Sequence, residues 1–416
     1  MTTNDHAGSL PASGQVPGVL TRLRPDRIVA RVAGRLRSGP WSVDALALTA
    51  IVMALVVLGL VMSFSASIVD AAEVGDPFIV FKRQASWAAI GVPAYLLVAA
   101  THHRVWQRLS WGIIAVALIG LFLVLVPGIG VTRQGATRWI GLGPVLFQPS
   151  ELAKLGSLLW LADVLRRKRP RDGEPFELRH LLLPAMPLLA VEALLVMFEP
   201  DLGTTLLLAM IVGLVLFVEG LPLRWYAAGV AMVGALGALA AIQAPYRLAR
   251  LTGWLDPEAD PLGSGFQLLQ SLYALGSGGV FGLGLGAGRG KWNYVPNPET
   301  DFVFAVIGEE LGLVGAGVVL LLFGALLWVG MRIARGAPSP YARTVAWVIT
   351  AWIVGQGLLN IATVTGLLPI TGVTLPMVSV GGSSLVSTLV GLGILAAIAR
   401  PTASEVVALP GVDARP

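Results

Sequence analysis

The sequence predicts an all-α polytopic membrane protein with ten transmembrane helices and both termini in the cytoplasm. Three observations predict this class. Apolar residues make up 55% of the 416 residues and charged residues only 13%, a balance that is improbable for a soluble globular protein of this length. The apolar residues are grouped in runs of about 20, the length that spans a hydrocarbon core as a helix. Basic residues are distributed unequally between the loops, and this asymmetry sets the orientation.

Ten apolar stretches are expected to cross the membrane as helices. Glycine and proline are frequent, with 50 and 27 residues, and both are tolerated in packed membrane helices. The sequence has no cysteine, which excludes a disulfide and a thiolate metal site. The stretches are residues 44–65, 84–100, 110–127, 150–166, 180–198, 202–219, 224–243, 303–331, 343–366 and 382–399.

Basic residues fix the orientation. If the N-terminus is cytoplasmic, 20 of the 29 lysines and arginines lie on the inner side, including the run RRKRPR at residues 166–171. The opposite orientation would place this run outside, which the positive-inside rule disfavours. The predicted organisation is a basic cytoplasmic tail at residues 1–43, a membrane domain at residues 44–400 and a second cytoplasmic tail at residues 401–416.

The N-terminal tail is polar and contains six arginines between Arg22 and Arg37. No apolar segment typical of a cleavable signal peptide follows the first methionine. Because the arginines adjoin the first apolar stretch, we expect them to contact anionic membrane lipids rather than nucleic acid.

A long polar interruption at residues 244–302 is predicted to be a large extracytoplasmic loop between the seventh and eighth helices. Within it, apolar and polar residues alternate at helical spacing from Phe266 to Leu275, which predicts a short helix near the membrane surface. The glycine-rich run GSGGVFGLGLGAGRGK follows at residues 276–291. Irregular backbone is tolerated at membrane depth only against protein or a wet cavity, so we expect this run to form close packing or a binding surface.

Charged residues inside the apolar stretches are a further indication of function, because a charge in lipid is costly. Glu151 and Lys154 lie three residues apart, on one helical face, at the start of the fourth stretch. Two interpretations stay open: a buried ion pair that locks helices together, or a lysine that meets an anionic ligand and is held by the glutamate. Asp163, beside the basic run, is expected to form an interfacial ion pair, and Glu192 has no assigned role.

Arg138 and Asp201 are two further polar residues on the predicted outer side. Arg138 precedes Trp139, which is expected to anchor at the membrane interface, and the planar guanidinium of the arginine suits a phosphate. Asp201 follows Glu199 and Pro200 at the start of the sixth stretch, where an aspartate can cap the free N–H groups of a helix. Capping and ligand binding both stay open for Asp201.

The large polar loop gives way to the eighth apolar stretch at Asp301, within the segment Asn293–Gly312. A carboxylate at this boundary would lie at a membrane surface with apolar helices behind it. Thr300 or Asp301 could cap the following helix, and a catalytic carboxylate is the alternative. Glu309 and Glu310 follow at about 12–13 Å along a helix. Neither can therefore pair with Asp301 within that helix, and a metal site would need another segment.

Four sequence blocks occur in order along the chain: GATRWIGLGPVLFQPSELAKL (135–155), EPDLGTTLL (199–207), GKWNYVPNPETDFVFAVIGEELGLVGA (290–316) and LLPITGVTLPMVSVGGSS (367–384). These blocks resemble the SEDS family (shape, elongation, division and sporulation) of cell-wall polymerases, and its FtsW division branch more than its RodA branch. The resemblance implies ten transmembrane helices and the polymerisation of lipid II into glycan strands beside a class B penicillin-binding transpeptidase. It covers nearly all of the membrane region and leaves out both tails.

The resemblance also implies which residues act. It places the essential aspartate of the family on Asp301, which would be the general base. It also places family residues on Glu151, Lys154 and Asp201. The expected substrate-binding residues are Arg138, Gln148, Ser150, Glu151, Lys154, Asp201, Lys291, Thr300, Ser383 and Ser384. The chain departs from the family pattern at four positions, where a glutamate, a histidine, a lysine and a tyrosine are replaced by Asn293, Glu299, Thr371 and Val380 respectively.

The expected chemistry agrees with a single essential carboxylate. No nucleotide is supplied outside the membrane, so a sugar donor must arrive already activated, for example on a lipid pyrophosphate. Because pyrophosphate is a good leaving group, one carboxylate that takes the proton of the acceptor hydroxyl suffices, whereas glycoside hydrolases usually need two. The transfer would invert the donor sugar. The departing diphosphate would be stabilised by a divalent cation (Mg²⁺ or Mn²⁺) or by Arg138, Lys154, Arg247, Arg289 and Lys291.

Two other functions stay open at this point. A flippase for the same lipid would use buried charges such as Glu151, Lys154 and Glu192 for translocation, but the sequence has no inverted repeat that would favour a transporter. A non-catalytic division scaffold would tolerate alanine at Asp301. We expect a multi-pass protein of the bacterial cytoplasmic membrane, at the division septum. Its expected partners are lipid II, the growing glycan strand, a class B transpeptidase, other division proteins and membrane lipids.

Overall fold

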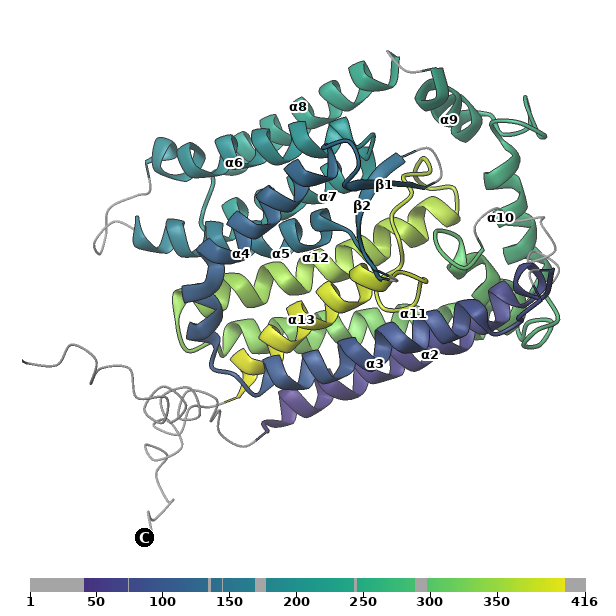
Figure 1. The fold of residues 1–416 in the computed structure, drawn as a ribbon, viewed down its shortest axis with the longest axis horizontal. Helices are drawn as coiled ribbons and strands as arrows, with labels where there is room; N and C mark the ends of the chain where they lie inside the picture. The colour runs from purple at the N-terminus through teal and green to yellow at the C-terminus, as the bar shows by residue number, and fades with distance from the viewer. Residues whose placement is uncertain are drawn as a thin grey trace, which may run out of the picture.

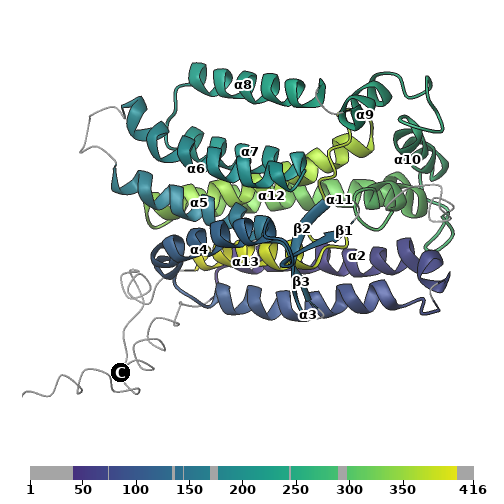
Figure 2. The same ribbon diagram turned by 45° about the horizontal axis from the view of Figure 1, so that its top comes forward.

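The helices of the computed structural model run side by side along one direction (Figures 1 and 2). Two short helices lie at one end of the bundle, and a small sheet lies between that end and the middle. The structure describes residues 41–73, 75–133, 136–143, 145–168, 177–242, 245–288 and 298–400. These residues form α2 (Val43–Glu73), α3 (Ile79–Ala99), α4 (His103–Val124), β1 (Gly130–Arg133), β2 (Ala136–Leu142), β3 (Val145–Phe147), α5 (Pro149–Arg167), α6 (Leu178–Phe198), α7 (Leu202–Val218), α8 (Leu223–Ile242), α9 (Pro245–Leu255), α10 (Phe266–Ser277), α11 (Val303–Arg335), α12 (Pro340–Val364) and α13 (Gly382–Ala399).

The ten predicted stretches each coincide with a helix, namely α2 to α8 and α11 to α13. In the described part of the chain, six of these helices are long and apolar enough to cross a membrane: α2, α4, α6, α11, α12 and α13. Helix α5 does not meet this measure because it carries Glu151, Lys154 and Asp163, which are buried inside the bundle. The protein is therefore a mostly helical, multi-pass membrane protein, as its composition predicts.

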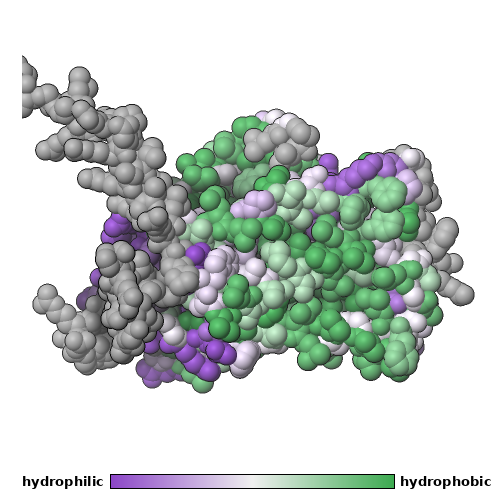
Figure 3. All heavy atoms as spheres, turned by 90° about the horizontal axis from the view of Figure 1, so that it is seen from below, coloured by the Kyte–Doolittle hydropathy of each residue, from purple (hydrophilic) through white to green (hydrophobic). Residues whose placement is uncertain are grey.

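Large apolar side chains cover the outer faces of the long helices. Trp111, Ile119 and Phe122 on α4, and Leu321 and Trp328 on α11, are each more than half exposed. Seen from below, hydrophobic residues cover the middle of the molecule, and hydrophilic residues gather toward its ends (Figure 3). Apolar surface on this scale is typical of a surface that contacts lipid rather than water.

Helices α5, α12 and α13 form the interior of the bundle, and most of their side chains are buried. Helix α13 packs against α3, and α5 packs against α4 and α7. The largest fully buried side chains include Trp352, Tyr95, Tyr341 and Lys154. A lysine in this set is unusual, and its environment is described with the site below.

A three-stranded antiparallel sheet, in the order β1-β2-β3, lies between α4 and α5, in the segment between the third and fourth predicted stretches. Ile140 of β2 pairs with Gly130 of β1 and with Phe147 of β3. The prediction of an all-α chain is wrong at this point. The strands have only three to seven residues, too few for a clear alternating pattern. Their ladder satisfies backbone groups that an irregular loop at the membrane surface would leave unpaired.

The large loop contains two helices. Helix α10 confirms the short helix predicted from Phe266, and its Ser271 Oγ donates to Val364 O at 2.7 Å. Helix α9 was not predicted. Its Trp254 Nε1 donates to Gly366 O at 2.9 Å, so both helices are fastened to the end of α12. This anchoring depends on residues about a hundred positions away, and no local pattern indicates it.

The glycine-rich run packs against a break in α11. Gly312 has φ +67° and ψ −164°, a conformation that interrupts the helix. Around the break, Leu283 N donates to Glu309 O at 3.0 Å, and Leu313 N donates to Gly279 O at 2.9 Å. The run thus provides partners for backbone groups that the break removes from the helical pattern. The described part of the run therefore packs closely against α11, one of the two outcomes expected from the sequence.

Gly312→Ala is expected to destabilise the protein. The alanine would require a positive φ, and its Cβ would lie 2.3 Å from Gly282 N and 2.5 Å from Val280 O. The backbone conformation alone costs about 1 kcal/mol, and relief of the contacts adds to it. Gly317→Ala is the matched control on the same helix, because no atom lies within 4 Å of its added Cβ. Thermal unfolding in detergent should show a lower Tm for Gly312→Ala only; equal Tm values for the two variants would contradict this account of the break.

Candidate active site

Asp301 lies in the turn that leads into α11. The helix begins at Val303, and its N-cap residue is Phe302, which makes no side-chain capping hydrogen bond. The interpretation of Thr300 or Asp301 as a helix cap is therefore wrong. No side chain in the described ranges donates a hydrogen bond to the Asp301 carboxylate, which is partly buried. The carboxylate is thus desolvated and free to accept a proton.

The backbone around Asp301 is fastened to α12 and to the loop before α13. Asn360 Nδ2, on α12, donates to Asp301 O and to Val373 O, both at 2.8 Å. Ser379 Oγ donates to Thr300 O at 2.6 Å. The bonds to Asp301 O and Thr300 O come from residues 59 and 79 positions away in sequence, and they hold the turn in one position. A rigid backbone is what a positioned general base requires.

Two further contacts complete the support of this turn. Val380 N donates to Glu299 O at 2.9 Å, although Val380 and Glu299 both depart from the family pattern. The bond uses backbone groups only, so it does not depend on those side chains. Gly372 also lies against the site, since a Cβ at this position would be 3.7 Å from Asp301 Oδ2.

Arg138 and Asp201 meet at the corner between α6 and α7. Arg138 Nη2 donates to Pro200 O at 2.7 Å, and its Nε lies 3.5 Å from Asp201 Oδ2. Asp201 is the N-cap of α7, where its carboxylate accepts from Thr204 N at 3.0 Å and from Thr204 Oγ1 at 2.8 Å. The capping interpretation of Asp201 is confirmed. Arg138 joins the sheet to this corner.

The same corner packs against the loop that carries Gly372. A Cβ on Gly203 would lie 2.6 Å from Thr371 O, so only glycine permits this approach of the two backbones. Arg138, Asp201 and Asp301, which are distant in sequence, are thereby brought to one region. Asp201 and Arg138 both act electrostatically on Asp301.

Burial raises the pKa of Asp301 to about 6. Removal from water is the main cause, because it disfavours the charged carboxylate. The positive charge of Arg250 on α9, and then that of Arg138, act in the opposite direction, while Asp201 and Glu299 raise the pKa further. A base with a pKa near the working pH combines an ionised form with a useful proton affinity.

Glu199 is a second perturbed carboxyl group beside the site. It is fully buried, and neither of its carboxyl oxygens has a hydrogen-bond partner among the described residues. Burial and then the nearby Asp201 charge raise the pKa of Glu199 to about 8, against a lowering effect of Arg138. Glu199 is therefore mostly protonated at neutral pH and adds little negative charge near Asp301.

Glu151 and Lys154 form a buried ion pair in α5. Lys154 Nζ lies 2.9 Å from Glu151 Oε2 and also donates to Oε1 at 2.9 Å. The ammonium group is 5.4 Å from the centre of the Trp352 ring. This geometry confirms a buried ion pair, but both partners lie on α5, so the pair itself does not lock two helices together. The ligand-binding role of Lys154 stays a prediction, and neither residue is among the charges that act on Asp301.

The remaining predicted site residues are spread over several elements. Gln148 precedes α5, and Ser150 is buried in its first turn with an Oγ that has no partner in the described residues. Ser383 and Ser384 lie in the first turn of α13, shortly after Val380. Lys291, and with it Arg289 and Asn293, lies outside the described residues.

Other predicted charges have structural partners. Asp163 accepts from Arg167 Nε at 2.8 Å, which confirms the interfacial pair, and from Gln107 Nε2 at 2.6 Å. Ser157 Oγ donates to Glu192, which gives the buried glutamate a partner on α5. Glu310 accepts a hydrogen bond from Ser65 on α2.

Sequence reasoning did not identify Arg250, Glu199 or Asn360 as parts of the site. Asn360 could have been found, because an amide within the apolar stretch 343–366 needs a polar partner. Arg250 could not, because the helix that carries it was not predicted. In the ranges that the structure describes, no three acidic or histidine side chains have the arrangement of a metal site. The participation of a divalent cation stays a prediction.

Relatives of known name show the family of this chain. The family model for the cell cycle proteins FtsW, RodA and SpoVE matches residues 45–404. Stage V sporulation protein E of Bacillus subtilis (strain 168) is 42% identical over 357 residues, which are 85% of this chain and 96% of the relative. A protein of Thioalkalivibrio sulfidiphilus named probable peptidoglycan glycosyltransferase FtsW is 42% identical over 388 residues, 92% of this chain and 94% of the relative.

Solved structures have a similar fold. A chain of a peptidoglycan synthase complex that coordinates polymerization and crosslinking matches with a TM-score of 0.69 at 33% identity, over 86% of this chain and 97% of that chain. The rod shape determining protein RodA of Thermus thermophilus matches with a TM-score of 0.63 at 30% identity, over 85% of this chain and 95% of that chain. The chain therefore belongs to the FtsW, RodA and SpoVE family of cell cycle proteins.

Proposed function

We propose that this protein is a peptidoglycan glycosyltransferase that polymerises lipid II into glycan strands at the outer face of the cytoplasmic membrane. The observation that carries the proposal is the Asp301 carboxylate, which is desolvated, without a hydrogen-bond donor from a described side chain, and held on a fixed backbone. Relatives named peptidoglycan glycosyltransferase support the substrate class. Their FtsW name supports a role in septal wall synthesis.

Asp301 is the general base of the proposed reaction. Its carboxylate accepts the proton of the acceptor hydroxyl while the hydroxyl oxygen forms a bond to the anomeric carbon of the donor sugar. The bond from that carbon to the diphosphate oxygen breaks, its electron pair leaves with the diphosphate, and the configuration inverts. Arg250 and Arg138, which already act on the Asp301 charge, stabilise the negative charge that develops on the leaving group.

The proposal includes a topology and a set of partners. Ten helices cross the membrane, the tails at residues 1–43 and 401–416 are cytoplasmic, and Asp301 faces outward together with the sheet, α9 and α10. Similarity to a chain of a complex that coordinates polymerization and crosslinking supports a class B transpeptidase as partner. The protein then works at the division septum with other division proteins.

A vesicle assay separates this function from its alternatives. Purified protein is placed in liposomes that contain labelled lipid II, and both the products and the leaflet distribution of the lipid are measured. We expect glycan strands and no faster exchange of lipid II between leaflets than in empty liposomes. Faster exchange without strands would establish a flippase instead, and neither activity, with the transpeptidase also present, would favour a scaffold.

Arg250→Gln is expected to shift the pH dependence of polymerisation. Because the Arg250 charge lowers the pKa of Asp301, its removal raises that pKa. The ionised base is required, so the rate of the parent falls as the pH drops through about 6, and the rate of the variant falls at a higher pH. Arg250→Lys keeps the charge and is the control. Initial rates between about pH 5 and pH 8 test this. If the rate of Arg250→Gln fell at the same pH as that of the parent, or if Arg250→Lys shifted as much as Arg250→Gln, the assigned role of Arg250 would be excluded.

A further inference from the structure

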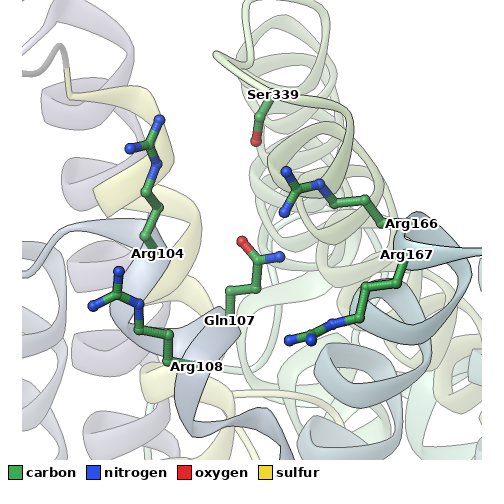
Figure 4. A pocket seen from close by; sticks show the side chains of 6 residues that line it. All are labelled: Arg104, Gln107, Arg108, Arg166, Arg167 and Ser339. Carbon is green, nitrogen blue, oxygen red and sulfur yellow. The ribbon is translucent and has the colours of Figure 1, made fainter.

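A basic pocket lies at the end of the bundle opposite to Asp301. Ser339 precedes α12 at the pocket, whereas Asn360, which holds Asp301, lies 21 residues later, or about 31 Å along a helix. The pocket has a volume of about 450 Å³. Figure 4 shows the arginines of α4 on one side and those of α5 on the other, with a glutamine between them. The lining residues are Arg104, Gln107, Arg108, Arg166, Arg167 and Ser339.

The pocket has an excess of positive charge. Two of the lining residues contact the carboxylate of the buried Asp163, which accepts from Gln107 Nε2 and from Arg167 Nε. The other three arginines form no ion pair with any residue that the structure describes, so three positive charges have no counterion within the described ranges. The N-terminus of α12, capped by Ser339 through Ala342 N, adds the positive end of a helix dipole. The pocket is therefore built to attract an anion.

An apolar surface continues from the pocket toward the middle of the bundle. Trp111 lies seven residues after Arg104 and three after Arg108, so it shares their face of α4. It is 52% exposed, and its ring packs edge-on against Trp160 of α5, with the ring centres 5.4 Å apart. Tryptophan is typical of the depth at which lipid headgroups meet acyl chains. The exposed Ile119 and Phe122 extend this surface along α4.

We propose that the pocket binds the headgroup of an anionic phospholipid. The phosphate lies between the arginines of α4 and those of α5, which donate charge-assisted hydrogen bonds to it, and the acyl chains follow the exposed face of α4 past Trp111. Basic pockets between helices on the cytoplasmic side suit such headgroups, and the positive-inside rule places this end in the cytoplasm. A soluble phosphate would meet the same arginines but would make no use of the apolar surface.

Lipid binding to purified full-length protein in detergent tests the proposal. The probes are a short-chain phosphatidylglycerol, the matching phosphatidylcholine and inorganic phosphate, with dissociation constants from native mass spectrometry. The double variant Arg104→Gln/Arg166→Gln is compared with Arg224→Gln/Arg335→Gln, which loses the same charge from exposed arginines of α8 and α11 outside the pocket. Thermal unfolding confirms that both variants fold.

We expect the pocket variant to bind phosphatidylglycerol at least about tenfold more weakly than the parent, and the control variant to stay within about twofold. Phosphatidylcholine should bind at least about tenfold more weakly than phosphatidylglycerol. Equal weakening in the two variants would overturn the proposal, because it would indicate attraction by overall charge. If an equal concentration of inorganic phosphate displaced phosphatidylglycerol, the proposal of a lipid ligand would be overturned, and the pocket would be a site for a soluble anion.

A second measurement needs no variant. Photoactivatable phosphatidylglycerol is reconstituted with the parent protein, illuminated, and its attachment sites are mapped by peptide mass spectrometry. We expect labels in residues 104–122 and 160–167, which border the pocket and the apolar face of α4. Labels spread over the exposed faces of α2, α6 and α11, without enrichment in these ranges, would contradict a specific site.

Discussion

Asp301→Asn is expected to reduce the rate of lipid II polymerisation by about 10² to 10⁴, the usual contribution of a general base. The same change should leave Tm at pH 7.5 equal to that of the parent or higher. Burial raises the pKa of Asp301 to about 6. The stability of the folded state therefore falls as the pH rises from the ordinary pKa of an aspartate to about 6, and this loss remains at higher pH. The neutral amide removes this penalty, and no described side chain loses a hydrogen bond to it.

Loss of rate without loss of stability distinguishes a catalytic carboxylate from a structural one. Glu258→Gln is the matched control, since it neutralises an exposed carboxylate of the same outer loop and should keep both the rate and the Tm of the parent. If Asp301→Asn lowered Tm by several degrees together with the rate, the carboxylate would have a structural role in the fold. An unchanged rate would remove it from the mechanism.

Lys154→Met should destabilise the protein strongly. It leaves the Glu151 carboxylate buried, with a relative exposure of 6%, and without its cation. Breaking a buried ion pair by removal of one partner costs about 3–5 kcal/mol. The double variant Glu151→Gln/Lys154→Met removes both charges and should recover most of this loss. Thermal unfolding in detergent measures both effects.

The exposed pair of Lys82 and Asp76 provides the control for this prediction. Its lysine side chain is 65% exposed, so Lys82→Met should change Tm little, because exposed ion pairs contribute little. Similar Tm values for Lys154→Met and Lys82→Met would show that the α5 pair is not a stabilising element. Recovery of polymerisation in the Glu151→Gln/Lys154→Met variant would exclude a ligand-binding role for Lys154.

Most of the membrane helices could be predicted from the sequence because each coincides with a largely apolar run of about 20 residues. The eighth stretch was predicted to begin at 303, and α11 begins at Val303. The short strands and α9 could not be predicted in the same way. Their few residues show no distinct period, and they are held in place by tertiary contacts such as that of Trp254 with Gly366.

The site could be predicted in part. Local pairs, such as Asp163 with Arg167, follow from helical spacing. The position of Asp301 followed from the boundary between polar and apolar sequence and from the family motif. The sequence could not predict that Asp301 does not cap α11, that Asn360 supports its backbone, or that the charge of Arg250 acts on it. These features depend on how α9, α11 and α12 pack. These contacts join residues about 50 to 60 positions apart, and no local pattern encodes them.

The central claim is that this chain itself forms glycan strands and that Asp301 is required. The most direct measurement uses purified parent protein and Asp301→Asn protein with labelled lipid II, each alone and with the transpeptidase partner, and separates the products by length. We expect a ladder of glycan strands from the parent and only unreacted lipid II from the variant. Equal ladders from both proteins, or no ladder from the parent even with its partner present, would contradict the account.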